Sequence, residues 1–310
     1  MSRRPLPQLD GRPFITDGGM ETSLLFHHGL ELPEFAAFVL LDQDAGIAAL
    51  REYYAPYVDI ARTQGVGVAL DTPTWRANGD WGAKLGYGPA ALADVNRRAV
   101  ALLEEIRSQA AGTEILISGA IGPRGDGYRV EATMTAAEAE LYHARQVNAF
   151  AGTAADFVAA ITLTYAVEAV GVARAAERAG IPAVIAFTVE TDGRLPSGQE
   201  LGDAIEEVDA ETNGSVAYFM VNCAHPTHFE HALDGAWADR VRGLRANAST
   251  MSHAELDEAE ELDDGDPEDL GARYAALRER LPRVNVLGGC CGTDHRHVAA
   301  ICDAWPRASG

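Results

Sequence analysis

Residues 157–189 read FVAAITLTYAVEAVGVARAAERAGIPAVIAFTV. The stretch opens and closes with a short apolar run, residues 157–163 and 183–189, and such runs are typical of buried parallel strands. The amphipathic residues between them end at Gly180, just before Pro182, where a helix is expected to stop. The order of strand, helix and strand predicts a β–α–β unit.

The same alternation recurs along the rest of the chain. The further strands that we expect are residues 14–17, 66–70, 114–121, 216–222, 241–245 and 284–287. The further helices that we expect are residues 43–64, 90–110, 135–150, 201–208, a short one from 227, one that follows the acidic run 255–269 and ends at 281, and 294–304. Eight strands, each followed by a helix, predict an α/β fold, a (β/α)₈ TIM barrel with a single domain over residues 1–310. A doubly wound open sheet uses the same local units and is the alternative.

The composition excludes several classes of partner. The chain has 46 Asp and Glu against 25 Lys and Arg, a net charge of −21 that disfavours nucleic acid and anionic membranes. No apolar run is long enough to span a bilayer, and the N-terminal residues lack the apolar segment of a secretory signal. Four cysteines are too few for a disulfide scaffold in a chain of 310 residues. We therefore expect a cytoplasmic protein with reduced thiols.

Three of the cysteines follow predicted strands. Cys223 comes directly after residues 216–222, and Cys290 and Cys291 follow residues 284–287 within the sequence GGCCGT. In a barrel these thiols lie at the same rim, where the active sites of such folds are built. Three thiolates with one open position are the ligands of a catalytic zinc. The flanking glycines let the backbone leave the strand so that adjacent thiols can converge.

Other interpretations of the cysteines remain open at this point. A buried cysteine is often a small apolar filler, which is our interpretation of Cys302 in the last helix. Cys290 and Cys291 can also form a strained disulfide. Spacing alone does not decide between these readings and a zinc site.

The remaining rim residues carry weaker signals. Three histidines recur beside Cys223, and two more open the last helix; we interpret them as polar residues of helix starts. The acidic run 255–269 is interpreted as a solvated face or loop. Acidic and aromatic side chains that follow strands could face a cationic substrate. These histidines, acids and aromatics are His225, His228, His231, His295, His297, Glu190, Asp192, Trp75, Tyr128 and Tyr165.

Four motifs together resemble one known family. They are DGGMET at 17–22, GAIGP at 119–123, VNC at 221–223 and GGCCGT at 288–293. Their order and placement are similar to the homocysteine S-methyltransferase family from about residue 14 to residue 301. The resemblance implies a barrel enzyme with one Zn²⁺ held by Cys223, Cys290 and Cys291, whose fourth position takes the sulfur of homocysteine. Homocysteine and a methyl donor are the implied small-molecule partners.

The resemblance also implies which residues bind substrate. The loop after the first strand is expected to hold the amino-acid end of homocysteine, and Asn222 is expected beside it. The residues of that loop are Asp17, Gly18, Gly19, Met20 and Glu21.

The chain departs from the family pattern after the fourth strand, where many members have Glu-Thr. Here the next carboxylate is Glu168, which should already be helical, so Thr164 or Thr162 is expected in that place. A hydroxyl holds an ammonium group less strongly than a carboxylate does. Either Glu21 or Glu190 compensates, or the acceptor thiol is not homocysteine.

The methyl donor is expected to be a small onium compound. The chain ends soon after the last predicted helix, so we expect no fused corrinoid or folate module. This favours S-methylmethionine or S-adenosylmethionine, with betaine as a further candidate. The alternatives are a methyltransferase for another thiol or with a separate corrinoid partner, and a non-catalytic barrel that binds zinc or an amino acid.

Overall fold

In a computed structural model of the chain, eight parallel strands close into a barrel in sequence order. The structure describes residues 5–305 except 131 and 260. The strands are β1 (Phe14–Thr16), β2 (Gly67–Asp71), β3 (Ile115–Ile121), β4 (Phe157–Leu163), β5 (Ala183–Phe187), β6 (Tyr218–Asn222), β7 (Val241–Ala246) and β8 (Val286–Gly289). β1 pairs with β8 as well as with β2, so the sheet has no open edge. The predicted (β/α)₈ barrel is confirmed, and the open sheet is excluded.

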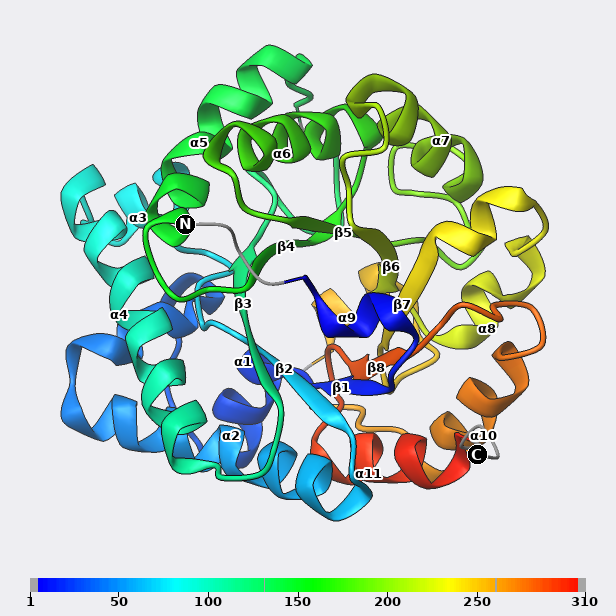
Figure 1. Cartoon of the computed structure of the whole chain (residues 1–310), viewed down its shortest axis with the longest axis horizontal. Coiled ribbons are helices and arrows are strands. Elements are labelled where there is room, and N and C mark those ends of the chain that lie inside the picture. Colours follow the sequence, from blue (N-terminus) through cyan, green and yellow to red (C-terminus); the bar gives the residue numbers. More distant parts are fainter. Residues whose placement is uncertain (1–4, 131, 260, 306–310) are drawn as a thin grey trace.

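Helices surround the barrel (Figure 1). They are α1 (Met20–Thr22), α2 (Asp44–Gln64), α3 (Gly79–Lys84), α4 (Pro89–Gln109), α5 (Ala136–Ala151), α6 (Ala166–Ala179), α7 (Leu201–Thr212), α8 (Pro226–Phe229), α9 (His253–Glu258), α10 (Pro267–Leu277) and α11 (His295–Ala304). Among the described residues, none of these helices is long and apolar enough to cross a membrane.

Local sequence signals account for several helix ends. Gly180 ends α6 in the left-handed conformation, with φ of 67°, as its position before Pro182 predicts. Thr135 caps α5: its side chain accepts the backbone N–H of Glu138, whose carboxylate in turn accepts the N–H of Thr135. α5 therefore begins, and α6 ends, where the sequence predicts.

Several elements differ from the sequence prediction. β8 begins two residues later than expected and includes both glycines that precede the cysteine pair. α10 ends at Leu277 rather than 281. Three short helices were not predicted: α1, α3 and α9. The Asn78 side chain at the start of α3 accepts the N–H of Trp81, and Ser252 and Glu255 form a capping box at the start of α9.

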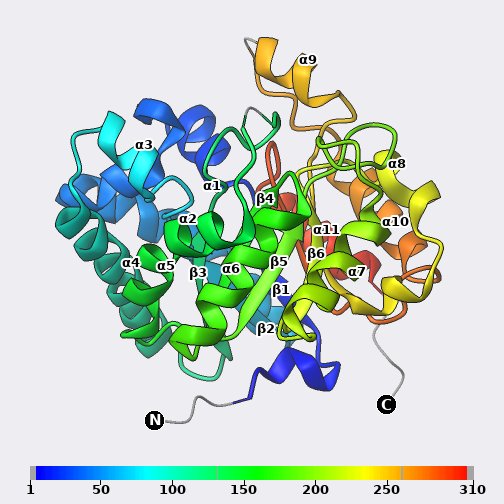
Figure 2. The same cartoon turned by 90° about the horizontal axis from the view of Figure 1, so that it is seen from above.

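Apolar side chains fill the barrel and the layer between barrel and helices. Large side chains of β1, β4 and β6, such as Phe14, Phe157 and Tyr218, pack together and are almost fully buried. Because this core is solid, a site can form only where loops leave the strands. The loops at the carboxyl ends of the strands provide that place. α9, which follows β7, projects beyond the barrel body (Figure 2).

Candidate metal centre and substrate pocket

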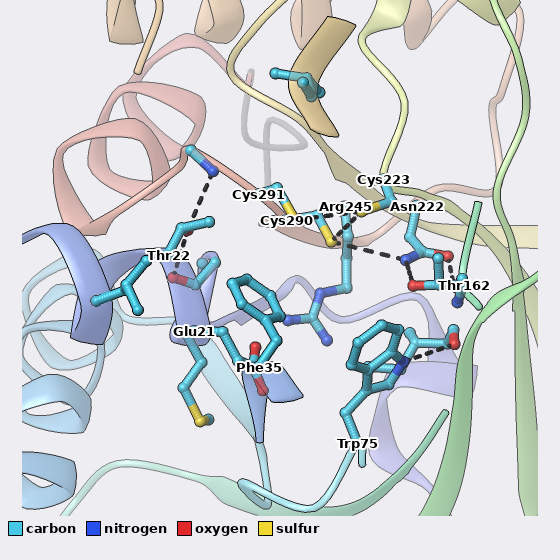
Figure 3. Close-up of a pocket in the computed structure, with 18 of the residues that line it drawn as sticks. Glu21, Thr22, Phe35, Trp75, Thr162, Asn222, Cys223, Arg245, Cys290 and Cys291 are labelled. Atoms are coloured by element: carbon cyan, nitrogen blue, oxygen red, sulfur yellow. Dashed lines mark hydrogen bonds between the residues drawn. The ribbon is translucent and has the colours of Figure 1, made fainter. Parts of the chain in front are cut away.

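A cavity of about 410 Å³ opens at the carboxyl ends of the strands. This volume lies within the range of roughly 300–1,000 Å³ that small-molecule sites occupy. Residues at or just after the carboxyl ends of seven of the eight strands line the cavity, and Figure 3 shows the side chains at its centre. Cys223, Cys290 and Cys291 lie on this wall, as do all five residues of the loop after β1 that the sequence assigns to substrate.

The three thiols converge on one point (Figure 3). The sulfur of Cys223 lies 3.0 Å from that of Cys290 and 3.6 Å from that of Cys291. All three sulfurs lie within 4.8 Å of one another, and the fourth cysteine, Cys302, is outside the group. Tetrahedral zinc with bonds of about 2.3 Å to sulfur places its ligands about 3.8 Å apart. The thiol cluster is therefore of a size that fits a zinc ion.

Backbone conformation brings the thiols together. Cys223 has φ of 56°, in the left-handed region that costs energy for a residue with a Cβ. Its N–H donates to the Arg245 carbonyl at 3.0 Å, and its own carbonyl accepts from the Asn247 amide at 3.1 Å. Gly292 follows the cysteine pair with φ of 77°, and a Cβ there would lie 2.8 Å from the Asp263 carbonyl oxygen. The turn after the pair thus requires glycine.

Polar side chains surround the sulfurs. The Tyr128 hydroxyl lies 3.2 Å from the sulfurs of both Cys223 and Cys291, and the Asn222 amide nitrogen lies 3.8 Å from that of Cys290. Hydrogen bonding with the other two thiols, together with the charge of Arg245, holds the pKa of Cys290 well below its usual range. The cluster therefore concentrates negative charge on Cys290, which favours a bound cation.

His253, the first residue of α9, contacts two residues of the thiol cluster and its surroundings, Tyr128 and Cys223. Its ring stacks on Tyr128 with centroids 4.1 Å apart, and its Nε2 lies 2.6 Å from the Cys223 carbonyl oxygen. Its Nδ1 lies 3.2 Å from the Glu190 carboxylate. Burial lowers the pKa of His253, but the bonds to Glu190 and to the carbonyl outweigh it, so the pKa is raised. Sequence reasoning missed this residue, although the capping box at Ser252 marks the helix that carries it.

The loop after β1 lies against the cysteine pair. The N–H of Gly19 donates to the Thr293 carbonyl at 2.9 Å, and a Cβ on Gly19 would lie 2.4 Å from the Cys290 carbonyl oxygen. Only glycine allows this approach. Glu21, two residues further, lies on the cavity wall (Figure 3), and burial raises its pKa to about 7. A cation bound beside Glu21 would favour its ionised form.

Asp17 lies on the wall, but its carboxylate is already paired. It accepts from Arg245 at 2.8 Å and from the Tyr53 hydroxyl at 3.2 Å. Arg245 also donates to Asp71 and, at 3.2 Å, to the Gly289 carbonyl. Burial and the nearby Asp71 raise the pKa of Asp17 to about 8, although Arg245 opposes the shift. Arg245, Asp17 and Asp71 thus form a buried, hydrogen-bonded cluster at the floor of the pocket.

Thr164 lies outside the cavity wall, and Thr162 is on it. The register between β4 and β5 shifts between Ala160 and Leu163, and Thr162 has φ of 64°. Of the two threonines expected in this place, the structure therefore puts Thr162, at the irregular part of the strand, on the wall. The N–H of Thr162 donates to Asn222 at 2.9 Å, and the Asn222 amide donates back to the Thr162 hydroxyl at 2.8 Å. Both residues are thereby fixed beside Cys290 (Figure 3).

Glu168 is helical, as expected, and does not face the cavity. It is buried, lies 2.9 Å from His143 Nε2, and accepts the N–H of Arg124 at 2.8 Å. Its role is to fix the loop after β3 and not to bind substrate. Of the two acids that could replace the missing carboxylate, Glu190 is engaged with His253, so Glu21 remains.

Some of the other residues that the sequence places at the rim line the cavity, and the others lie outside its wall. Trp75 and Tyr128 line the cavity, whereas Tyr165 does not and accepts the Met134 N–H at 3.2 Å instead. Asp192 and the five rim histidines named from the sequence also lie outside the wall. The acidic run was interpreted as a solvated face or loop. That interpretation was incomplete, because Asp257, Glu261 and Asp263 form part of the wall.

A closed (β/α)₈ barrel with a three-thiol cluster in its rim pocket defines a class of barrel proteins equipped to bind a thiophilic metal. A profile of the homocysteine S-methyltransferase family matches residues 14–305. The chain therefore belongs to the homocysteine S-methyltransferase family. No curated protein sequence gives a significant match.

Solved structures of the same fold are similar over nearly the full length. The oxidized form of the homocysteine methyltransferase MmuM from Escherichia coli superposes with a TM-score of 0.73 at 20% identity, covering 93% of this chain and 94% of that chain. Its metallated form gives a TM-score of 0.72 at 20% identity, covering 96% and 98%. At this identity the likeness supports the fold.

Proposed function

We propose that this chain is a zinc-dependent methyltransferase that moves a methyl group from a small onium donor to the sulfur of homocysteine and so forms methionine. The convergence of Cys223, Cys290 and Cys291 in the rim pocket is the observation that carries the proposal. Membership of the homocysteine S-methyltransferase family supports the reaction class. S-methylmethionine and S-adenosylmethionine are the favoured donors, and betaine is a further candidate.

The donor set suits zinc. Cys223, Cys290 and Cys291 supply three sulfur ligands, and no described acid or histidine joins them within the same spacing. Zinc held in this way supplies an open position that ionises an incoming thiol at neutral pH, where a free thiol with a pKa of roughly 8.5 is mostly protonated. Asn222, Tyr128 and His253 orient the cysteines through the contacts described above. Such supporting contacts usually tune the affinity of a metal site.

Glu21 is proposed to hold the ammonium group of homocysteine. It is the carboxylate on the wall that belongs to the loop beside Cys290 and makes no ion pair among the described side chains. An ammonium group beside it would favour the ionised carboxylate at neutral pH and form a charge-assisted hydrogen bond. Glu21 thereby replaces the carboxylate that the chain lacks after β4, and homocysteine remains the preferred acceptor.

The charge of the pocket supports a cationic donor. Seven acidic side chains face two arginines on the wall: Asp17, Glu21, Asp71, Asp126, Asp257, Glu261 and Asp263 against Arg76 and Arg245. Trp75, Tyr128 and Phe35 add aromatic surface, which attracts sulfonium and quaternary ammonium groups. The pocket is thus electrostatically suited to an onium ion.

The methyl step itself needs no proton transfer from the protein. The thiolate sulfur forms a bond to the methyl carbon as the bond from that carbon to the onium centre breaks, and the electron pair leaves with a neutral thioether or amine. The pocket contributes by aligning the two substrates and excluding competing groups.

The test combines metal analysis with product analysis. The protein is purified anaerobically, its zinc content is measured, and it is incubated with homocysteine and each donor while methionine is followed by mass spectrometry. We expect about one zinc per chain and methionine from at least one onium donor. Cys290→Ser should lose both zinc and activity, whereas Cys302→Ser, a change outside the cluster, should retain both.

The other outcomes discriminate between the alternatives. Zinc without methionine from any donor would point to another acceptor thiol or a separate corrinoid partner. Wild-type protein without zinc under reducing conditions would refute the proposed metal centre.

A further inference from the structure

Arg76 is a buried cation of the pocket wall with no carboxylate partner in the described parts of the chain. It follows β2, and only 8% of its surface is exposed. Its Nη1 donates to the Gly125 carbonyl at 3.2 Å, and its Nε has no hydrogen-bond partner. Because a buried charge is costly unless it is paired, this guanidinium lacks a counter-charge.

Two tryptophans hold the Arg76 guanidinium. Its central carbon lies 4.2 Å from the centroid of the Trp75 ring and 3.6 Å from that of Trp81. Both indoles are anchored: Trp75 donates to the Ile161 carbonyl at 3.1 Å, and Trp81 donates to the Gly125 carbonyl at 3.3 Å. With its central carbon packed against both rings, the guanidinium can meet a ligand through its N–H edge. That edge matches the two oxygens of a carboxylate.

The other arginine of the pocket, Arg245, is already paired with carboxyl groups of the protein. Arg245 donates hydrogen bonds to Asp17, Asp71 and the Gly289 carbonyl. Burial lowers the pKa of Arg76, and the charges of Asp126 and Glu21 offset this only in part. Arg76 is therefore the position on an otherwise acidic wall where an anionic group of a ligand is stabilised.

We infer that Arg76 binds the carboxylate of the methyl donor and thereby fixes where the onium centre of the donor lies. This inference rests on the proposed function. The acceptor must place its sulfur at the cysteines and its ammonium group at Glu21. Arg76 instead emerges beside Trp75, whose ring supplies aromatic surface for an onium group. An onium centre near the aromatics and a carboxylate at Arg76 would orient the donor with its methyl group toward the acceptor.

The test pairs a change in Arg76 with a change in the substrate. The kcat/KM values of wild type and Arg76→Gln are measured with S-methylmethionine and with (3-aminopropyl)dimethylsulfonium, the same donor without its carboxylate. We expect Arg76→Gln to reduce kcat/KM about 10–100-fold more for the carboxylate donor than for its analogue, mainly through KM. Arg76→Lys keeps the charge but not the planar guanidinium. Its preference for the carboxylate donor should lie between those of wild type and Arg76→Gln.

The controls separate this inference from a general structural effect. Arg124→Gln removes another arginine that lies on an aromatic ring, that of Tyr142, but outside the pocket wall, so it should affect the two donors equally. Zinc content and circular dichroism of each variant report on folding. A loss of equal size for both donors in Arg76→Gln would overturn the inference.

A further comparison distinguishes the two substrates. If the penalty of Arg76→Gln disappears when homocysteine is replaced by 3-aminopropane-1-thiol, which lacks the carboxylate, Arg76 binds the acceptor and the donor assignment is wrong.

Wild type that forms no methionine from any donor would refute the proposed function instead. In that case the fluorescence of Trp75 and Trp81, titrated with S-methylmethionine and its analogue, still tests carboxylate binding: Arg76→Gln should abolish the preference for the carboxylate, and a wild type without that preference would refute the inference.

Discussion

Replacing Arg245 by Met should destabilise the fold by about 3 kcal/mol at pH 7. The Arg245 side chain is 6% exposed, and its partners Asp17 and Asp71 are 1% and 7% exposed. Removing one member of a buried ion pair typically costs about 3–5 kcal/mol, because the other charge is left without a partner. We expect the lower end of this range because the raised pKa of Asp17, about 8, lets that carboxyl hold a proton at pH 7. Asp71 is then the buried carboxyl group that loses its guanidinium partner.

Urea unfolding measures this cost. It should be followed by fluorescence and circular dichroism in the presence of a chelator, so that a change in metal binding does not contribute to the apparent stability. Arg273→Met is the matched control: it removes an ion pair to Asp269 in which the two side chains are 33% and 52% exposed, and it should cost less than about 1 kcal/mol.

A double-mutant cycle identifies the source of the effect. Asp71→Asn combined with Arg245→Met should recover part of the loss, with a coupling energy of about 1–3 kcal/mol. If Arg245→Met unfolds at the same urea concentration as Arg273→Met, the buried cluster does not stabilise the fold and the electrostatic account of the pocket floor is wrong.

Two further predictions concern the walls of the site. Glu21→Gln should raise KM for homocysteine about tenfold or more with a smaller effect on kcat. In wild type, kcat/KM should rise as the pH increases through about 7, where Glu21 ionises, and the variant should lack this step; identical pH profiles would exclude the role of Glu21. His253→Ala should lower zinc affinity about 10–100-fold in competition with a chelator, because it removes the support of Cys223 and Tyr128. His231→Ala, at an exposed histidine away from the wall, is the control, and equal affinities in the two variants would contradict the supporting role.

The sequence predicts the barrel because each unit carries its own signals. β4 occupies the residues that its apolar run indicates, and α5 begins at the predicted capping box of Thr135. The placement of the thiols follows from the barrel itself, since Cys223 and the cysteine pair directly follow β6 and β8. Short-range patterns together with one rule of topology are thus sufficient to bring three distant thiols to one rim.

The polar partners of the thiols could not be predicted in the same way. Arg245 pairs with Asp17, which lies 228 positions away in the sequence. His253 contacts the Cys223 carbonyl from the start of a helix that leads into the acidic run. Such contacts depend on side-chain packing and not on periodicity. An arginine near the carboxyl end of a predicted strand, as Arg245 is in β7, is a signal in the sequence for such a buried ion pair. Thr162 has a positive φ beside a register shift, and no local sequence pattern predicts either feature.

The distribution of charge over the pocket links the metal centre to the orientation of both substrates. Negative charge is concentrated on Cys290 at the thiol cluster and on Glu21 beside it, so this end of the pocket favours zinc and an ammonium group. Arg245 is neutralised on the floor by Asp17 and Asp71, so it does not compete for an anionic ligand. Arg76 is left as the unpaired cation on the described wall, beside aromatic rings that suit an onium ion. A zwitterionic donor placed by these charges has one favourable orientation, and a donor without a carboxylate loses that constraint. The selectivity for donor should therefore depend on Arg76, and the ionisation of the acceptor on the cysteines.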